Sequence, residues 1–414
     1  MSVNLDLYIY LEMKNLKYNK IKTLIIASSS EPLPRRILLD TIIRGVLRVP
    51  FEVTVSKKLR LFNYKNLLSR MLQIHYDKLS YTQDWLNGIS NNQYIEAEVC
   101  NITNLLDFRA KIHKIKDYEL IVILHSALGD DCRLLNWLSM FFDKRKCKLV
   151  AFIGNEYDLL PEKKQLLNKL NVDIICTQLP LAVASWLYSD LPSAKVIAMP
   201  HALNTAKYFD YKKSRENIIG FIGNAHPLWI GDNERTKVIM SAKETLDELN
   251  LPNYIKLNGS NLFSSDWVNF LNKSIGTIGA ESGTYYMDKS GERLMLAKDL
   301  VNSRPSIDIS DLNSQIFQVD NIEFKSAKCI SARHFEAIGT KTCQLLLEGE
   351  YNNILIPDVH YIKINKNLSN LKESIYRLLD YEERLKIIKN AYEYVAKNHT
   401  YECRVNELIY KVFG

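Results

Sequence analysis

The stretch 148–177, KLVAFIGNEYDLLPEKKQLLNKLNVDIICT, places a helical segment between two short apolar runs. The runs Lys148–Ile153 and Val172–Thr177 end in polar or glycine residues, a pattern typical of buried strands. The segment Pro161–Leu170 has the length and spacing of a helix. A strand, a helix and a second strand of these lengths predict a right-handed βαβ unit with parallel strands.

The same alternation extends along most of the chain. In the N-terminal half it predicts strands at Lys22–Ser28, Leu120–Leu124 and Ala194–Met199, and helices at Leu134–Phe142 and Leu181–Tyr188. After a polar stretch at 200–214, a second series predicts a helix at Arg235–Leu249 and strands at Asn217–Gly223, Ile255–Leu257, Ile275–Gly279, Ser306–Ile309 and Cys343–Leu347. Two helical segments follow, Asn370–Lys397 with a break at Asp380, and Thr400–Phe413.

Two series of this kind predict an α/β protein of two Rossmann-like domains that face each other across a cleft. We place the linker near 205–216. The predicted divisions are 1–210, 211–396, and a C-terminal helix at 397–414 that returns to the first domain.

Composition narrows the class of protein. The chain has 414 residues, enough for two or three domains, and 47% of them are apolar. Lysine and arginine number 54 against 47 acidic residues, a net charge of +7. This charge suits an anionic small ligand or an acidic surface, but it is too thinly spread for a nucleic-acid-binding protein.

The cysteines and the N-terminus bear on the cellular compartment. Seven cysteines are widely spaced without a CxxC pair, which argues against a disulfide framework and a zinc site. Residues 1–20 do not have the pattern of a signal peptide, and no apolar run approaches the ~20 residues of a membrane-spanning helix. We expect a cytoplasmic protein without a metal or cofactor. Any membrane association would be peripheral, through basic residues of the N-terminal half.

The segment Ser331–Asn353, SARHFEAIGTKTCQLLLEGEYNN, contains the strongest motif. Glu336 lies at the start of a predicted helix and could accept hydrogen bonds from a vicinal diol such as a ribose. Arg333 lies one turn earlier and could bind a phosphate with two parallel hydrogen bonds. The alternative is a glutamate that stabilises the helix dipole beside a solvated arginine.

This segment resembles the C-terminal domain of GT-B glycosyltransferases, and most closely the group 1 branch related to spore-maturation proteins. The resemblance rests on Arg333-x-Phe335-Glu336-Ala337, a following strand, His360-Tyr361 and Leu368-Ser369-Asn370-Leu371. It covers roughly 220–410 and extends more weakly over 120–210. It implies a metal-independent enzyme that moves a sugar from a nucleotide-linked donor to a glycan or lipid-linked acceptor, in bacterial surface polysaccharide or glycoconjugate synthesis. The donor sugar, the acceptor and the oligomeric state stay open.

One position departs from the family pattern. Many retaining members have a glutamate eight residues before the one that matches Glu336, and this chain has Lys328 there. Retention or inversion of the anomeric centre is therefore left open. A catalytically silent protein that binds a nucleotide or another small anion is the alternative to an enzyme.

Candidate site residues come from the loops that follow predicted strands, where α/β sheets bind ligands. The turn at Gly223 could bind phosphates through its backbone N–H groups, although a plain turn with surface cations is the alternative. Donor-binding candidates are Gly223, Asn224, His226, Arg235, Lys237, Ser282, Gly283, Arg333, Glu336, Glu350, Tyr351 and Asn352.

The candidate catalytic groups are His125, Glu156, Glu281 and Asp288. His125 could act as a base or bind the donor sugar, and Glu281 and Asp288 could orient hydroxyls or accept a proton. Loop or turn residues with satisfied hydrogen bonds are the alternative in each case. Ser29, Arg35 and Arg36, in a loop stiffened by two prolines, are candidates for binding the acceptor.

Overall fold

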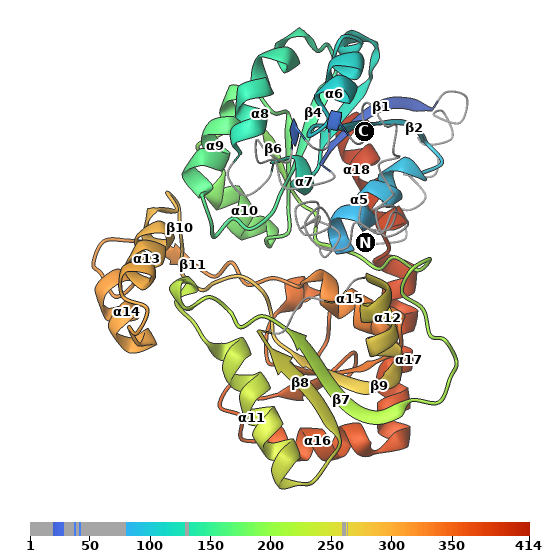
Figure 1. The fold of residues 1–414 in the computed structure, drawn as a ribbon, viewed down its shortest axis with the longest axis vertical. Helices are drawn as coiled ribbons and strands as arrows, with labels where there is room; N and C mark the ends of the chain where they lie inside the picture. Colours follow the sequence, from blue (N-terminus) through green and yellow to red (C-terminus); the bar gives the residue numbers. More distant parts are fainter. Residues whose placement is uncertain are drawn as a thin grey trace.

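The computed structural model describes residues 20–28, 37–38, 41–42, 80–128, 132–258, 262 and 264–414 (Figure 1). The acceptor candidates Ser29, Arg35 and Arg36 lie outside the described residues.

A six-stranded parallel sheet forms the centre of the N-terminal half, in the order β2-β1-β3-β4-β5-β6. Its inner strands are largely apolar on both faces and are buried except at Lys22 of β1 and Lys148 of β4, as a sheet covered by helices on both sides requires. Val122 of β3 lies opposite Val150 of β4, which lies opposite Ile174 of β5. The strands are β1 (Ile21–Ala27), β2 (Ile95–Asn101), β3 (Leu120–Ile123), β4 (Lys148–Ile153), β5 (Ile174–Thr177) and β6 (Lys195–Ala198).

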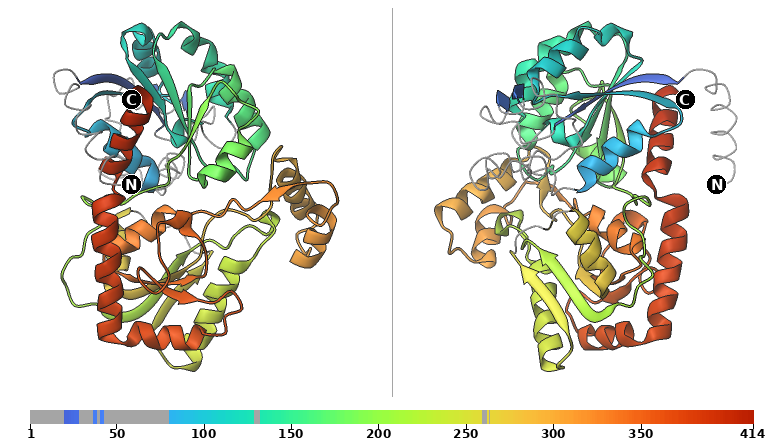
Figure 2. Two further views of the ribbon diagram at one scale, coloured as in Figure 1. Left: turned by 180° about the vertical axis from the view of Figure 1, so that it is seen from behind. Right: turned by 45° about the vertical axis from the view of Figure 1, so that its right-hand side comes forward.

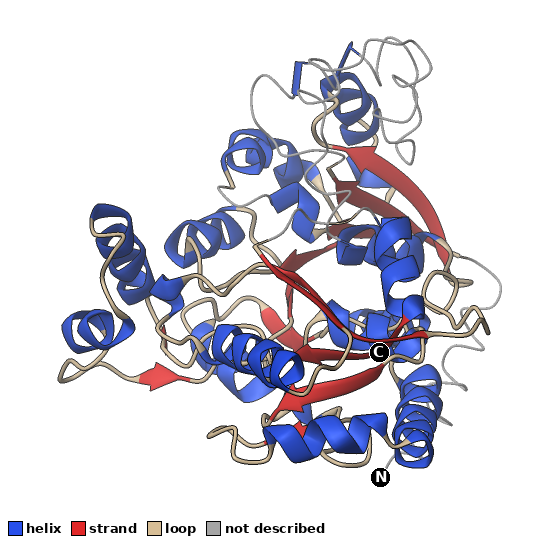
Figure 3. Cartoon of the chain, turned by 60° about the horizontal axis from the view of Figure 1, so that its bottom comes forward, coloured by secondary structure: helices blue, strands red, loops and turns tan. Residues whose placement is uncertain are grey.

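Helices cover both faces of this sheet (Figure 3). One face packs on Phe142 and Leu166, and the other on Trp85, Tyr401 and Val405. The α-helices are α5 (Ser80–Ser90), α6 (Leu105–Ile112), α7 (His125–Leu128), α8 (Arg133–Leu138), α9 (Leu160–Lys169) and α10 (Leu181–Leu187), with 3-10 helices η5 (Ile115–Asp117) and η6 (Ser139–Lys144).

A second, five-stranded parallel sheet forms the C-terminal half, in the order β13-β12-β9-β7-β8. Its strands are β7 (Glu216–Gly223), β8 (Asn253–Leu257), β9 (Ser274–Gly279), β12 (Cys343–Leu347) and β13 (Ile362–Ile364). Its helices are α11 (Glu234–Glu248), α12 (Ser264–Lys273), α15 (Ala332–Gly339), α16 (Leu371–Leu379) and α17 (Tyr381–Asn398), with 3-10 helices η7 (Leu228–Ile230) and η8 (Tyr351–Asn353). The protein is therefore an α/β protein of two Rossmann-like domains, as predicted.

Residues 287–325 extend from the second sheet as a side arm that packs on η7 and lies beside the first domain (Figure 1). The arm consists of β10 (Met287–Asp288), α13 (Glu292–Ser303), α14 (Ile309–Ile316) and β11 (Phe324–Lys325). The ammonium of Lys298 lies 2.8 Å from the Asp158 carboxylate of the first domain. The strand predicted at Ser306–Ile309 is wrong, because the Asp308 side chain accepts a hydrogen bond from the Asp311 N–H and thereby caps α14.

The chain returns to the first domain at its C-terminus (Figure 2). Asp380 ends α16 and caps α17, which confirms the predicted break. Thr400 caps α18 (Tyr401–Phe413), and this helix packs on α5. The predicted boundary at 210 falls between β6 and β7, and the boundary at 396 falls inside α17; both stay predictions. In the described part of the chain, no helix is both long enough and apolar enough to cross a membrane.

Candidate functional site

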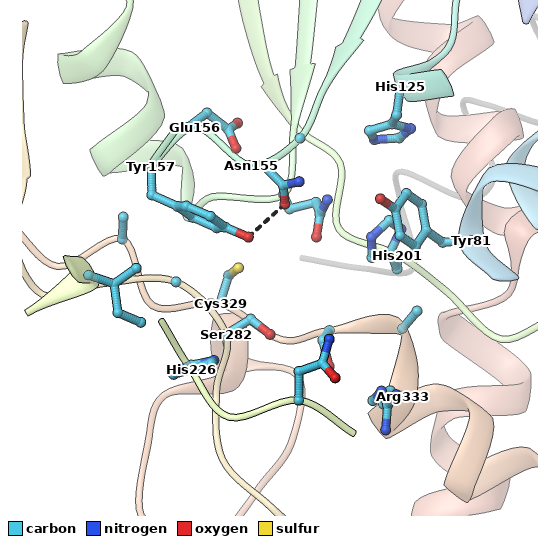
Figure 4. Close-up of a pocket in the computed structure, with 18 of the residues that line it drawn as sticks. Tyr81, His125, Asn155, Glu156, Tyr157, His201, His226, Ser282, Cys329 and Arg333 are labelled. Atoms are coloured by element: carbon cyan, nitrogen blue, oxygen red, sulfur yellow. Dashed lines mark hydrogen bonds between the residues drawn. The ribbon is translucent and has the colours of Figure 1, made fainter. Parts of the chain in front are cut away.

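A cavity of about 540 Å³ lies between the two domains (Figure 4). The loops after β3, β4 and β5 form one wall, and the loops after β7 and β9 with the start of α15 form the other. Carboxyl ends of parallel strands therefore face the cavity from both sides, as expected for ligand sites of α/β sheets. Of the predicted residues, those that line it are His125, Glu156, Asn224, His226, Arg235, Ser282, Gly283, Arg333 and Glu336.

His125 is the first residue of α7, directly after β3. Burial, reinforced by the positive charge of Lys163, lowers the pKa of its imidazole to about 3. Its Nδ1 atom is buried and has no hydrogen-bond partner among the described residues. The ring lies beside Tyr81 and His201, with centroids 5.6 and 5.8 Å away (Figure 4). His125 is thus a neutral ring that a ligand hydroxyl could reach.

Glu156 lies on the loop that follows β4. The hydroxyl of Thr177 donates a hydrogen bond to its carboxyl group, and burial raises the pKa of that group. Lys163 stabilises this loop. Its ammonium donates hydrogen bonds to the carbonyls of Gly154, Asn155 and Asp158 at 2.8–3.0 Å. Lys163 thereby fixes the backbone that carries Glu156.

Two guanidinium groups meet at the Gly223 turn on the opposite wall. A Cβ atom at Gly223 would lie 3.1 Å from Arg333 Nη1 and 3.4 Å from Arg235 Nη2, so glycine leaves room for both. Arg333 lies over the ring of Trp267 at 4.7 Å and donates to the Ile222 carbonyl at 2.5 Å.

Neither arginine forms an ion pair with a described carboxylate. Burial and the neighbouring Arg333 lower the pKa of Arg235 to about 10, so Arg235 stays charged at neutral pH. Burial also lowers the pKa of Arg333, against the attraction of Glu336. Glu336 attracts Arg333, but no described carboxylate stabilises the charge of Arg235, so an anion that enters the cavity can bind between the two guanidinium groups.

Glu336 and His226 complete this wall. The Glu336 carboxylate is buried and accepts hydrogen bonds from Trp267 Nε1 at 2.6 Å and from the Tyr208 hydroxyl at 3.2 Å. Burial, with the charges of Arg235 and Lys328, lowers the pKa of His226 to about 3. His226 is therefore neutral, as His125 is.

The other predicted residues lie outside the cavity lining. Glu281 is buried and accepts a hydrogen bond from the Tyr351 N–H at 2.7 Å, which holds the loop that contains Glu350. Asn352 joins the domains, because it accepts from the Ile330 N–H and donates to the Gln178 carbonyl.

Two further predicted residues also lie apart. Asp288 belongs to the side arm and accepts a hydrogen bond from the Ser290 hydroxyl at 2.6 Å. Lys237 is exposed on α11. The structure thus does not bring the carboxyl groups of Glu281 and Asp288 together with His125.

Lys328 forms a buried ion pair where the family pattern has a glutamate. Its ammonium lies 2.8 Å from the Asp232 carboxylate and 4.5 Å from the centre of the Tyr285 ring. Asp232 follows η7, which borders the cavity. The ion pair therefore connects two segments of the second wall, and no free carboxylate is present at this position.

Several lining residues were not predicted from the sequence, among them Tyr81, Thr82, Tyr157, Gln178, Trp267 and Cys329. Tyr81 and Trp267 lie near the starts of helices, and no motif marks them. His201 also lines the cavity, and its Nδ1 accepts a hydrogen bond from Trp85 Nε1 at 3.1 Å.

Comparison with known proteins gives one family match. Residues 306–410, about a quarter of the chain, match the glycosyl transferase-like family model. This segment contains Arg333 and Glu336. No curated protein matches the sequence significantly.

Solved structures with a similar fold include a sucrose-phosphate synthase from Thermosynechococcus elongatus, with 11% identity, 95% of this chain and 99% of that chain covered, and a TM-score of 0.45. Anabaena Alr3699/HepE in complex with UDP-glucose has 10% identity, coverage of 94% and 100%, and a TM-score of 0.47. TarM has 11% identity and a TM-score of 0.45; the match covers 75% of this chain and 58% of TarM. At these TM-scores the similarities bear on neither function nor site.

Proposed function

We propose that this protein is a GT-B glycosyltransferase that moves a sugar from a nucleotide-linked donor to a glycan or lipid-linked acceptor in the synthesis of bacterial surface polysaccharides or glycoconjugates. The observation that carries the proposal is the pair of guanidinium groups, Arg235 and Arg333, at the Gly223 turn of a cavity between two Rossmann-like domains. The family match over residues 306–410 supports the same class of enzyme.

The diphosphate of the donor would bind between the two arginines. Both cations lack a described carboxylate partner, so a bound diphosphate relieves their mutual repulsion and gains charge-assisted hydrogen bonds. As the bond to the sugar breaks, negative charge grows on the leaving phosphate oxygen. The same arginines then bind the transition state more tightly than the ground state, which accelerates the reaction.

The opposite wall would bind the sugar and the incoming hydroxyl. A ring with a pKa of about 3 accepts a proton poorly at neutral pH, so we assign His125 to hydrogen bonding with a hydroxyl rather than to general base catalysis. Glu156, with its raised pKa, is the candidate proton-transfer group that lines the cavity. Glu336 keeps its proposed role at the ribose, and Ser282 and Gly283 are proposed to contact the sugar.

Titration calorimetry with UDP, GDP, ADP and their glucose conjugates tests the donor site. We expect at least one nucleotide to bind, and Arg235→Ala and Arg333→Ala each to weaken binding by about 10- to 100-fold, the value of one or two charge-assisted hydrogen bonds. Lys237→Ala, on the same helix but outside the cavity, is the matched control and should bind normally. Absence of any nucleotide binding, or equal affinity in the arginine variants, would reject the proposal.

A catalytically silent nucleotide-binding protein is the second candidate, and Lys328 favours it, because its ion pair occupies the position of a family glutamate. Slow release of free sugar from the donor that binds best distinguishes the two. Release that stops in Glu156→Gln, at unchanged donor affinity, supports the enzyme. Tight binding without release or transfer supports the silent protein.

A further inference from the structure

A ridge of large apolar side chains is exposed on the first domain, away from the cavity. It consists of Leu106 on α6, Trp137 on α8, and Met140 and Phe141 on η6. Their exposed fractions are 51%, 68%, 66% and 39%. We call these four residues the apolar ridge.

The elements that carry the ridge pack together. The ring of Phe108 on α6 lies 5.8 Å from Phe141, and η5 packs against η6. The opposite face of α8 and η6 is also apolar, and its residues Leu135, Leu138 and Phe142 are buried in the core. The helices are thus apolar on two faces, and the core explains only one of them.

Cations on the same helices and adjoining loops accompany the ridge, and we call them the basic rim. Residues 105–117 and 133–148 contain nine lysines and arginines against three aspartates, a net charge of +6 in a chain whose total is +7. Five of these cations are exposed and form no ion pair with a described residue: Arg109, Lys114, Lys116, Lys144 and Lys146. An apolar centre with a basic rim complements a surface that is apolar beneath and anionic on top.

We infer that the apolar ridge docks the protein on an anionic membrane surface, with Trp137, Met140 and Phe141 between the lipid headgroups and the basic rim against lipid phosphates. A second copy of the chain is the weaker occupant, because it would bring two basic rims together. The inference does not depend on the proposed function, since no ridge residue lines the cavity. If both hold, the cavity works beside a lipid-linked acceptor.

Sedimentation with vesicles tests the inference on the full chain. We expect binding to phosphatidylcholine vesicles that contain phosphatidylglycerol, weak binding to phosphatidylcholine alone, and release at high salt. Trp137→Ser with Met140→Ser, and separately Lys144→Glu with Lys146→Glu, should each reduce the vesicle partition coefficient by about 10-fold or more.

Matched controls replace exposed residues that lie outside the ridge. Ile356→Ser with Phe413→Ser, and Lys372→Glu with Lys386→Glu, should bind vesicles as the unaltered protein does. All four variants should keep their nucleotide affinity, so a failed donor site and a failed ridge give different results. Binding that is independent of phosphatidylglycerol, or unchanged in the ridge variants, overturns the inference. So does a dimer in lipid-free solution that Trp137→Ser with Met140→Ser dissociates.

Discussion

Lys328 stands where the family pattern has a glutamate, and it forms an ion pair with Asp232 instead. Their ion pair is buried, with 5% and 8% of the two side chains exposed. Lys328→Met keeps most of the volume but leaves the Asp232 carboxylate buried without its cation. We expect the free energy of unfolding to fall by about 3–5 kcal/mol. Adding Asp232→Asn should recover much of the loss in urea denaturation, and a Lys328→Met variant of full stability would contradict the assignment.

Asp84 should make the stability of the protein depend on pH. It is buried, and burial raises the pKa of its carboxyl group to about 6 despite the attraction of Lys207. Because the folded state holds the proton more tightly than the unfolded state, stability from this group is present below about pH 4 and is lost as the pH rises towards 6.

Asp84→Asn removes this dependence. Between about pH 4 and pH 7 the unaltered protein should lose about 2–3 kcal/mol of stability relative to the variant, measured by urea denaturation. Asp143→Asn, at an exposed position, is the control and should follow the unaltered protein. Parallel pH profiles for the Asp84→Asn variant and the unaltered protein would contradict the prediction.

Residues of the site could be predicted from the sequence where they follow the end of a strand. His125 and Glu156 lie two and three residues after the ends of β3 and β4, and both line the cavity. Glu281 also follows a strand, but its side chain turns to the Tyr351 N–H. Chain position gives the end of the sheet on which a residue lies, but the direction of its side chain depends on hydrogen bonds formed across the fold.

Among the helices and strands, the inner strands were predicted because both of their faces are buried and their sequences are therefore continuously apolar. β2 was missed, since it lies at the edge of the sheet and its sequence IEAEVCN lacks the continuous apolar run of the inner strands. β13 has three residues, too few for a pattern. The side arm was not predicted, because its two strands have two residues each and its packing on the first domain involves distant parts of the chain.

Gly283 lies in the loop between β9 and the side arm. Its φ is +91°, and a Cβ atom there would lie 2.1 Å from the Ala327 carbonyl oxygen. Gly283→Ala must therefore push apart two backbone segments that are paired at Ser282 and Cys329. We expect a loss of at least about 3 kcal/mol, from strain and clash together, in urea denaturation. Ser282→Ala, one residue away, should be nearly neutral, and a stable Gly283→Ala variant would show that the segments are not held together.

The two domains are joined across the cleft by the side arm as well as by the chain. The Lys298–Asp158 pair is partly exposed, so its own contribution to stability is about 1 kcal/mol or less. Lys298→Glu replaces the attraction with repulsion and should weaken nucleotide binding several-fold by favouring an open cleft. Adding Asp158→Lys should restore both affinity and the radius of gyration in X-ray scattering, whereas an unchanged radius in Lys298→Glu would exclude the arm as a brace.

The position of α18 has a consequence for biosynthesis. The helix covers one face of the first sheet through Tyr401, Val405 and Leu408, which pack with Trp85. The ribosome makes these residues only after the entire second domain. While translation proceeds, that face of the first sheet is therefore uncovered, and the first domain cannot complete its core before the second has been synthesised.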